Sequence, residues 1–218
     1  MTKLSTEEGA FDLVCTDDWL YYRIHCTRHL SQPYAYFKHD LVQNLEVTSQ
    51  EFNRIKYRGA MPPFQDGEEV VFLPDGQSLR SYLGAVPHLF SARGEWVRAL
   101  PDSVVAGDSI YSIALDGRGY LWTAEPTFHY VGQYDLTTGN RLFSLGGSFD
   151  AGEINHPEDI SIYDNDAFIS DMGNERLVLL DTCTKRFNTY RTFTQPVWQY
   201  RRFKQQELVH LQDGFYLL

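Results

Sequence analysis

The residues best able to do chemistry in this sequence are its carboxylates and its seven histidines, but none of them stands in a known catalytic motif. The histidines are scattered along the chain. His25 and His29 have the i, i+4 spacing that brings two metal ligands together only on a helix, and the surrounding YYRIHCTRHL instead predicts a strand and a turn. The sequence holds no HExxH, no CxxC, no GxSxG nucleophile elbow and no phosphate-binding GxxxxGK[ST]. These patterns predict neither a zinc enzyme nor a serine hydrolase nor a nucleotide-binding protein.

Aromatic and arginine side chains in the predicted connections are the better candidates for a binding function. Tyr, Trp and Arg are the residue types that most often anchor protein interfaces. The alternative is that many of them pack between elements of the core. The candidates are Tyr34, Tyr36, Phe128, His129, Tyr130, Trp198, Tyr200, Arg201 and Arg202.

Charge and cysteine use narrow the class of partner and the compartment. The net charge is −10, which argues against nucleic acid, because phosphate binding needs basic surface, and favours a basic protein partner reached by electrostatic steering. The three cysteines form no CxxC motif. We expect them to be ordinary free thiols, which are usual in a reducing compartment. No apolar stretch approaches the ~18–20 residues that span a bilayer. We therefore expect a cytoplasmic monomer that binds neither membrane nor nucleic acid.

The elements that must position these residues are short strands in hairpins. Alternating runs surround Asp75-Gly76, Asp116-Gly117, Asp164-Asn165 and Asp213-Gly214. Such pairs tolerate the positive φ that tight hairpin turns require. One segment departs from this pattern: Thr48 to Glu51 has capping-box spacing and predicts a short helix in the following FNRIKY.

The hairpins recur with a period. Gly119–Asp135 aligns with Asn165–Asp181 without a gap, at an offset of 181 − 135 = 46 residues. Four-stranded propeller blades need ~40–50 residues. We therefore predict an all-β propeller in a single domain, with five blades near residues 11–58, 67–100, 108–146, 155–193 and 196–218. The last span is short, so a strand from the N-terminus is expected to complete that blade and cover its edge.

The residues of two of these blades resemble known repeats. PEDISI followed by AFISDMGNERLVLLD, within Pro157–Asp181, resembles an NHL repeat, and DGRGYLWTAEP is similar to the blades of gluconolactonase-like (SMP-30-type) propellers. The resemblance covers residues 107–193. It implies that Asp171 and Arg176 are architectural, with Asp171 accepting hydrogen bonds from the turn at Gly173-Asn174, and that Trp122 and Phe168 pack between blades.

The same resemblance supplies an enzymatic alternative. A lactonase or related hydrolase of the SMP-30 type holds a divalent cation, Ca²⁺ or Zn²⁺, on oxygen ligands in its channel. The candidate ligands here are Glu125, Glu158 and Asp171, with Asp159 and Asn174 nearby. The motifs around them do not match the family's ligand positions.

The sequence thus predicts a non-enzymatic, protein-binding propeller without catalytic residues, metal or cofactor. One specific form of this hypothesis is an inhibitor or immunity-type protein that neutralises a basic toxin such as a nuclease. The metal-dependent lactonase remains the alternative.

Overall fold

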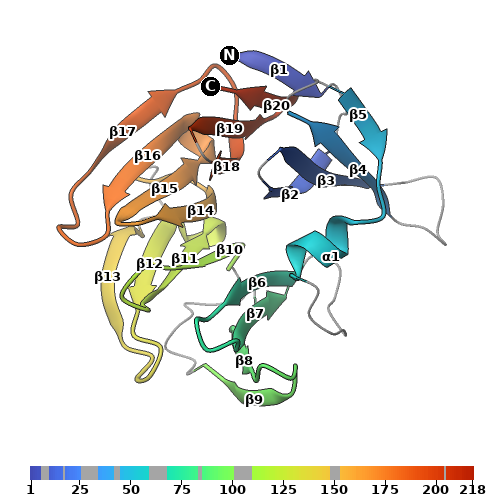
Figure 1. Ribbon diagram of the computed structural model, residues 1–218. Helices are drawn as coiled ribbons and strands as arrows, with labels where there is room; N and C mark the ends of the chain where they lie inside the picture. The colour runs from blue at the N-terminus through green and yellow to red at the C-terminus, as the bar shows by residue number, and fades with distance from the viewer. Residues whose placement is uncertain are drawn as a thin grey trace. The chain divides into compact units, whose positions relative to one another are not determined.

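A computed structural model describes residues 1–5, 10–16, 18–25, 34–41, 45–58, 68–82, 85–100, 110–147, 153–203 and 205–218. The described strands form five four-stranded antiparallel sheets (Figure 1). Blade 1 contains β2 (Ala10–Cys15), β3 (Trp19–His25), β4 (Tyr34–Asp40) and β5 (Leu45–Thr48). Blade 2 contains β6 (Glu68–Phe72), β7 (Ser78–Tyr82), β8 (His88–Phe90) and β9 (Trp96–Ala99).

Two further blades follow in the same order of strands. Blade 3 contains β10 (Ser112–Leu115), β11 (Leu121–Glu125), β12 (Tyr130–Tyr134) and β13 (Arg141–Gly146). Blade 4 contains β14 (Pro157–Tyr163), β15 (Asp166–Asp171), β16 (Arg176–Asp181) and β17 (Phe187–Thr192). In both blades the second and third strands pair at equivalent positions, Glu125 with Tyr130 and Asp171 with Arg176. The repeat offset read from the sequence therefore describes real structural equivalence.

The last sheet takes one strand from each end of the chain. Blade 5 has the order β1 (Thr2–Ser5), β20 (Gly214–Leu217), β19 (Gln206–Leu211) and β18 (Val197–Phe203). Thr2 lies opposite Leu217 and Lys3 opposite Tyr216. The predicted fold class, a five-bladed all-β propeller whose last blade is completed by an N-terminal strand, is confirmed.

The chain divides into two compact units, Met1–Ala60 with Arg201–Leu218, and Met61–Tyr200. The first unit has an apolar core around Leu20, Tyr22 and Phe215. The second unit holds blades 2 to 4 and two apolar clusters, one of which joins Trp122 and Val131 of blade 3 to Ile169 of blade 4. Strands β11 and β12 of blade 3 are buried along their whole length, so both of their faces contribute to the core.

Hairpin turns occur where the sequence predicts them, but the left-handed residue is not always the predicted one. In the turn between β10 and β11 the positive φ, +83°, lies at Gly119 rather than at Gly117. Asp116 sets this geometry, because its carboxylate accepts hydrogen bonds from the backbone N–H groups of Arg118 and Tyr120, at 3.0 and 3.1 Å.

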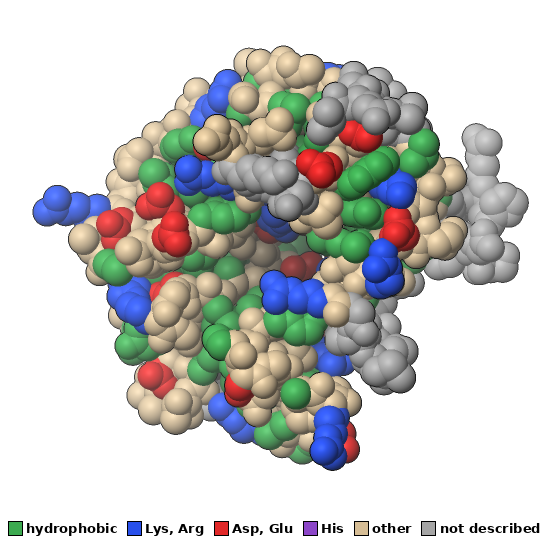
Figure 2. Space-filling model, in the orientation of Figure 1, with side chains coloured by type: hydrophobic (Ala, Val, Ile, Leu, Met, Phe, Trp, Pro, Cys, Tyr) green, Lys and Arg blue, Asp and Glu red, His purple; other side chains and the backbone are tan. Residues whose placement is uncertain are grey.

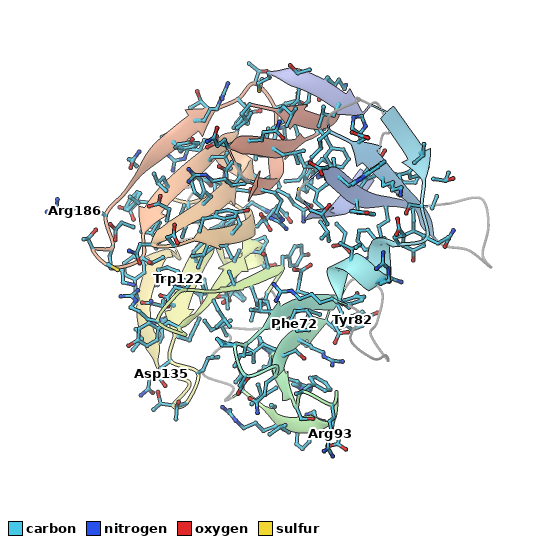
Figure 3. All side chains as sticks on the ribbon, in the orientation of Figure 1. Phe72, Tyr82, Arg93, Trp122, Asp135 and Arg186 are labelled. Carbon is cyan, nitrogen blue, oxygen red and sulfur yellow. The ribbon has the colours of Figure 1, made fainter. Side chains whose placement is uncertain are left out.

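The interface between blades 3 and 4 is partly polar. The Lys185 ammonium, from the turn between β16 and β17, lies 4.5 Å from the centre of the Trp122 ring. The Arg118 guanidinium donates a hydrogen bond to the Thr182 carbonyl at 2.6 Å. Figure 3 shows Trp122 on its strand and Arg186 at the tip of the hairpin that carries Lys185. Trp122 packs between blades as predicted, and its ring also makes a cation–π contact with Lys185 of the neighbouring blade.

Helix α1 (Phe52–Lys56) lies where the sequence predicts a helix, but the predicted capping box does not form. The Glu51 carboxylate instead bonds to the Lys38 ammonium at 2.9 Å and to the Arg54 guanidinium at 2.7 Å. Two cations therefore hold the side chain that would otherwise reach back to the helix start. No helix in the described parts of the chain is long and apolar enough to cross a membrane.

Candidate functional site

Connections from blades 3 and 4 converge at one end of the second unit. They are η2 (Pro126–Phe128) with His129, η3 (Met172–Asn174) with Glu175, and the segment 153–156 that leads into β14. We call residues 126–129, 153–156 and 172–175 the loop end. The Gly173 N–H donates to the Asn155 carbonyl at 2.9 Å, which ties two of the three segments together. A side chain at Gly173 would meet Asn155 at 2.6 Å, so this close approach requires glycine.

The backbone of the two connections is the same. His129 and Glu175 both have a left-handed φ of 53°, and they are 46 positions apart (175 − 129). A left-handed conformation costs a non-glycine residue roughly 1–2 kcal/mol. Since both blades adopt it, the strain belongs to the blade architecture, and only the side chains distinguish the two connections.

In blade 4 the loop end rests on the fully buried carboxylate of Asp171. It accepts hydrogen bonds from the Asn155 N–H at 2.7 Å, from the Asn174 amide at 2.9 Å and from the Arg176 guanidinium at 2.6 Å. Arg176 also donates to the hydroxyl of Thr189 and to the carbonyl of Glu153. A buried charge is stable only when it is paired and hydrogen-bonded, and this network meets that need. The architectural role predicted for Asp171 and Arg176 is confirmed.

In blade 3 a different buried network occupies the equivalent place. Glu125, where blade 4 has Asp171, accepts a hydrogen bond from the Thr123 hydroxyl at 2.9 Å. Tyr130, where blade 4 has Arg176, bonds through its hydroxyl to that of Tyr134. Burial raises the pKa of Tyr130, with the hydrogen bond to Tyr134 as the next cause. These phenols therefore stay protonated, and the network is structural.

The chemically distinctive part of the loop end is a group of two histidines and one glutamate. The backbone N–H of His156 donates to Nδ1 of His129 at 3.0 Å, across 27 residues of sequence. Nδ1 of His156 lies 3.0 Å from Oε1 of Glu158. The two imidazole rings are 6.1 Å apart and nearly perpendicular, at 71°.

Burial sets the protonation of this group. It raises the pKa of Glu158 to about 7, and the neighbouring Asp159 carboxylate adds to the effect. Burial also lowers the pKa of His156, with His129 as the second cause. Burial therefore favours the uncharged form of both the carboxyl and the imidazole.

The residues predicted to bind a partner fall into three environments. Phe128 and His129 lie half-buried at the loop end, whereas Tyr130 and Tyr200 are buried in the core and offer no surface. Tyr200 stacks on Phe168 at 4.5 Å. The remaining candidates are Tyr36, Trp198 and Arg201, half-buried, Arg202, exposed, and Tyr34, whose side chain is outside the described residues.

The three carboxylates predicted as alternative metal ligands are engaged separately. Glu125 bonds within blade 3, Asp171 bonds to Arg176, and Glu158 faces His156. Among the described residues, no three His, Cys, Asp or Glu side chains are grouped so as to hold a metal ion. The described geometry does not fit a divalent cation at these residues, and the lactonase alternative stays a prediction.

Sequence reasoning named Glu158 as a ligand and His156 only as one of several scattered histidines. Strand alternation gives no signal for this pair, because His156 precedes β14 with a left-handed φ of 55° and the register of β14 shifts between Pro157 and Asp159. The contact with His129 had no sequence signal either, since it depends on how two blades pack.

Comparison with known proteins supports the fold. No protein-family model matches the sequence, and no curated protein sequence matches it. Among solved structures, the computationally designed Ika8 protein matches with a TM-score of 0.53 and 9% identity, over 95% of this chain and 57% of that one. The WD40 repeats of RRP9 match with a TM-score of 0.54 and 9% identity, over 72% of this chain and 52% of that one.

A third similar structure is an enzyme. Virginiamycin B lyase from Staphylococcus aureus matches with a TM-score of 0.52 and 12% identity, over 100% of this chain and 72% of the lyase. The chain thus spans little more than half the length of the designed protein and the WD40 protein. At these identities the likeness concerns the fold alone. The similarity supports the β-propeller scaffold and does not single out the NHL or SMP-30 families.

Proposed function

We propose that this protein is a protein-binding β-propeller whose loop end, at blades 3 and 4, receives a basic partner. The observation that carries the proposal is the convergence at this end of exposed acidic groups and half-buried apolar ones. Glu153 and Glu175 are exposed there, beside the half-buried side chains of Phe128 and Met172. An apolar centre with a charged rim is the usual composition of an interface.

The sign of the local charge favours a cationic surface on the partner. Arg176, which follows the loop end as the first residue of β16, is held by the Asp171 carboxylate at 2.6 Å, so it does not offset Glu153 and Glu175. Figure 2 shows acidic and basic side chains interspersed over the visible face. Over longer distances the net charge of −10 attracts a basic protein. The glutamates of the loop end then contact it directly.

An inhibitor or immunity-type protein that covers a basic toxin, such as a nuclease, is the specific form of this proposal. A rigid set of blades suits occlusion, because a preformed surface loses little conformational entropy on binding. WD40 propellers, to which the fold is similar, commonly mediate protein interactions, which supports the same class of function.

The proposal is tested by affinity capture under native conditions, with recovered proteins identified by mass spectrometry. The wild type is compared with Glu153→Lys/Glu175→Lys and with the control Glu95→Lys/Glu207→Lys, which makes the same charge change elsewhere. We expect a basic protein whose recovery falls at least tenfold in the loop-end variant, survives in the control and weakens with added salt. Recovery of no specific protein, or equal recovery by both variants, would contradict the proposal.

A further inference from the structure

We propose that β1 pairs with β20 in trans as well as in cis, so that two copies of this chain form a dimer by exchanging their first strands. The surface concerned is the outer edge of blade 5, and the inference does not rest on the loop end. It replaces the monomer expected from the sequence with an equilibrium between monomer and dimer. The observation that carries it is the contrast between a lightly held donor strand and a firmly packed acceptor strand.

Strand β1 is held along one edge and by few side chains. It is the outermost strand of blade 5 and, among the described strands, pairs with β20 alone (Figure 1). Thr2 and Lys3 are exposed, and Leu4 is only half-buried. The register is interrupted between Lys3 and Ser5, which leaves Leu4 without a partner residue on β20. Because β1 buries little apolar surface, its detachment costs less than that of an inner strand.

The acceptor strand β20 is anchored by contacts that do not involve β1. Phe215 is fully buried, and its ring lies 4.9 Å from the ring of Tyr22 in blade 1 and 4.7 Å from that of His210 on β19. On its inner side β20 pairs with β19 from Leu208 opposite Leu217 to the turn. When β1 leaves, β20 therefore keeps its place and presents an edge of unpaired backbone groups, which favours the pairing of another strand.

The side chains at this edge fit a cation followed by an apolar residue. The Lys3 ammonium lies 2.9 Å from the Asp213 carboxylate and 5.6 Å from the centre of the Tyr216 ring, where cation–π attraction adds to the ion pair. Leu4 packs against the apolar cluster that contains Phe215. The first strand of a second copy has the same order of residues, so in trans it makes every contact that β1 makes in cis.

Reciprocal exchange leaves no edge of either copy unpaired. Each copy donates one β1 and receives one, which closes the dimer with two-fold symmetry. Only four residues, 6–9, connect β1 to β2, and short connections of this kind favour exchange between copies. Since the contacts in cis and in trans are the same, protein concentration decides the equilibrium.

The test reverses one charge of the ion pair in each of two full-length variants, Lys3→Glu and Asp213→Lys. Within either chain positions 3 and 213 then repel each other, whereas a strand-exchanged dimer of one variant with the other has two attractive pairs. The variants are refolded together from urea, and sedimentation equilibrium and native mass spectrometry follow dimerisation up to about 1 mM protein. Each exposed pair contributes modestly, but two repulsions become two attractions. We therefore expect an association constant at least tenfold above that of the wild type, with a smaller gain at high salt.

The control mixes wild type with the double variant Lys3→Glu/Asp213→Lys. Both of these chains have an attractive pair in cis and would have only repulsive pairs in a mixed dimer. The mixed dimer should therefore be rarer than the wild-type dimer, although the mixture contains the same four side chains as the first one.

A disulfide trap identifies the surfaces that meet and does not depend on the charge variants. Thr2 lies opposite Leu217, at a spacing that a disulfide can bridge. A Thr2→Cys chain is mixed with a Leu217→Cys chain and oxidised mildly, and neither chain can form this bond within itself. Peptide mapping should find a disulfide between positions 2 and 217 at least tenfold more often than between positions 2 and 95 when Thr2→Cys is mixed with Glu95→Cys, which replaces an exposed residue.

Equal disulfide yields in the two mixtures, or a charge-reversed mixture that stays monomeric, would overturn the proposal. A monomeric mixture that nevertheless binds a labelled peptide with the sequence of residues 1–9 would assign the edge to a strand from a different protein, and would overturn the second copy as its occupant.

Discussion

Replacing Glu158 by Gln should stabilise the protein increasingly as the pH rises. Burial raises the pKa of this carboxyl from an ordinary 4.5 to about 7 in the folded state. The protonated carboxyl therefore adds stability below pH 4.5. This contribution disappears as the pH rises to 7, because the Glu158 carboxyl ionises above pH 4.5 in the unfolded chain but stays protonated up to about pH 7 in the folded protein. Each pKa unit is worth about 1.36 kcal/mol, so the full loss is about 3 kcal/mol.

The assay is urea unfolding followed by tryptophan fluorescence, with wild type and Glu158→Gln compared at several pH values. Between pH 5.5 and 8 the difference in unfolding free energy should grow by about 2 kcal/mol in favour of the variant. Glu175→Gln is the matched control at the same loop end. It replaces an exposed side chain, for which changes stay within about 0.5 kcal/mol. A difference for Glu158→Gln that does not change with pH would refute the assignment of a neutral, buried carboxyl.

Three further outcomes follow from individual contacts. Asp171→Asn should lower the unfolding free energy by about 3 kcal/mol, because it removes the buried carboxylate that pairs with the half-buried guanidinium of Arg176; urea unfolding measures the change. Gly132→Ala should cost about 1–3 kcal/mol, since the new Cβ would lie 2.6 Å from the ring of Tyr134; a shift in thermal midpoint checks this. Burial raises the pKa of the Cys15 thiol to about 12, so at pH 8 a disulfide reagent should label exposed Cys183 quickly and Cys15 only after unfolding, as peptide mapping would show.

Local sequence determined most of the blade architecture. Turn residues such as Asp164 and Gly76, both with positive φ, mark hairpins because few other residues tolerate that backbone. Strand alternation and the offset between the two blades then predict the sheets. The Asp171–Arg176 pair was also predictable, since these residues face each other at the end of one hairpin.

Tertiary structure decided which of the candidate side chains are accessible to a binding partner. Phe128, Tyr130 and Tyr200 belong to the residue types that form interfaces, yet Tyr130 and Tyr200 are buried while Phe128 stays partly exposed. Residue type does not separate an aromatic anchor from a core aromatic, because both functions use the same apolar surface.

The group of His129, His156 and Glu158 at the loop end also depends partly on the sequence and partly on the tertiary structure. The sequence by itself determined only that His156 and Glu158 lie two residues apart where a strand begins; the left-handed φ of His156 and the register shift between Pro157 and Asp159 set how they face. Only the packing of blade 3 against blade 4 brought His129 to His156 and removed Glu158 from water. Proton affinity depends on that burial and on neighbouring charges, and neither is written in the order of the residues.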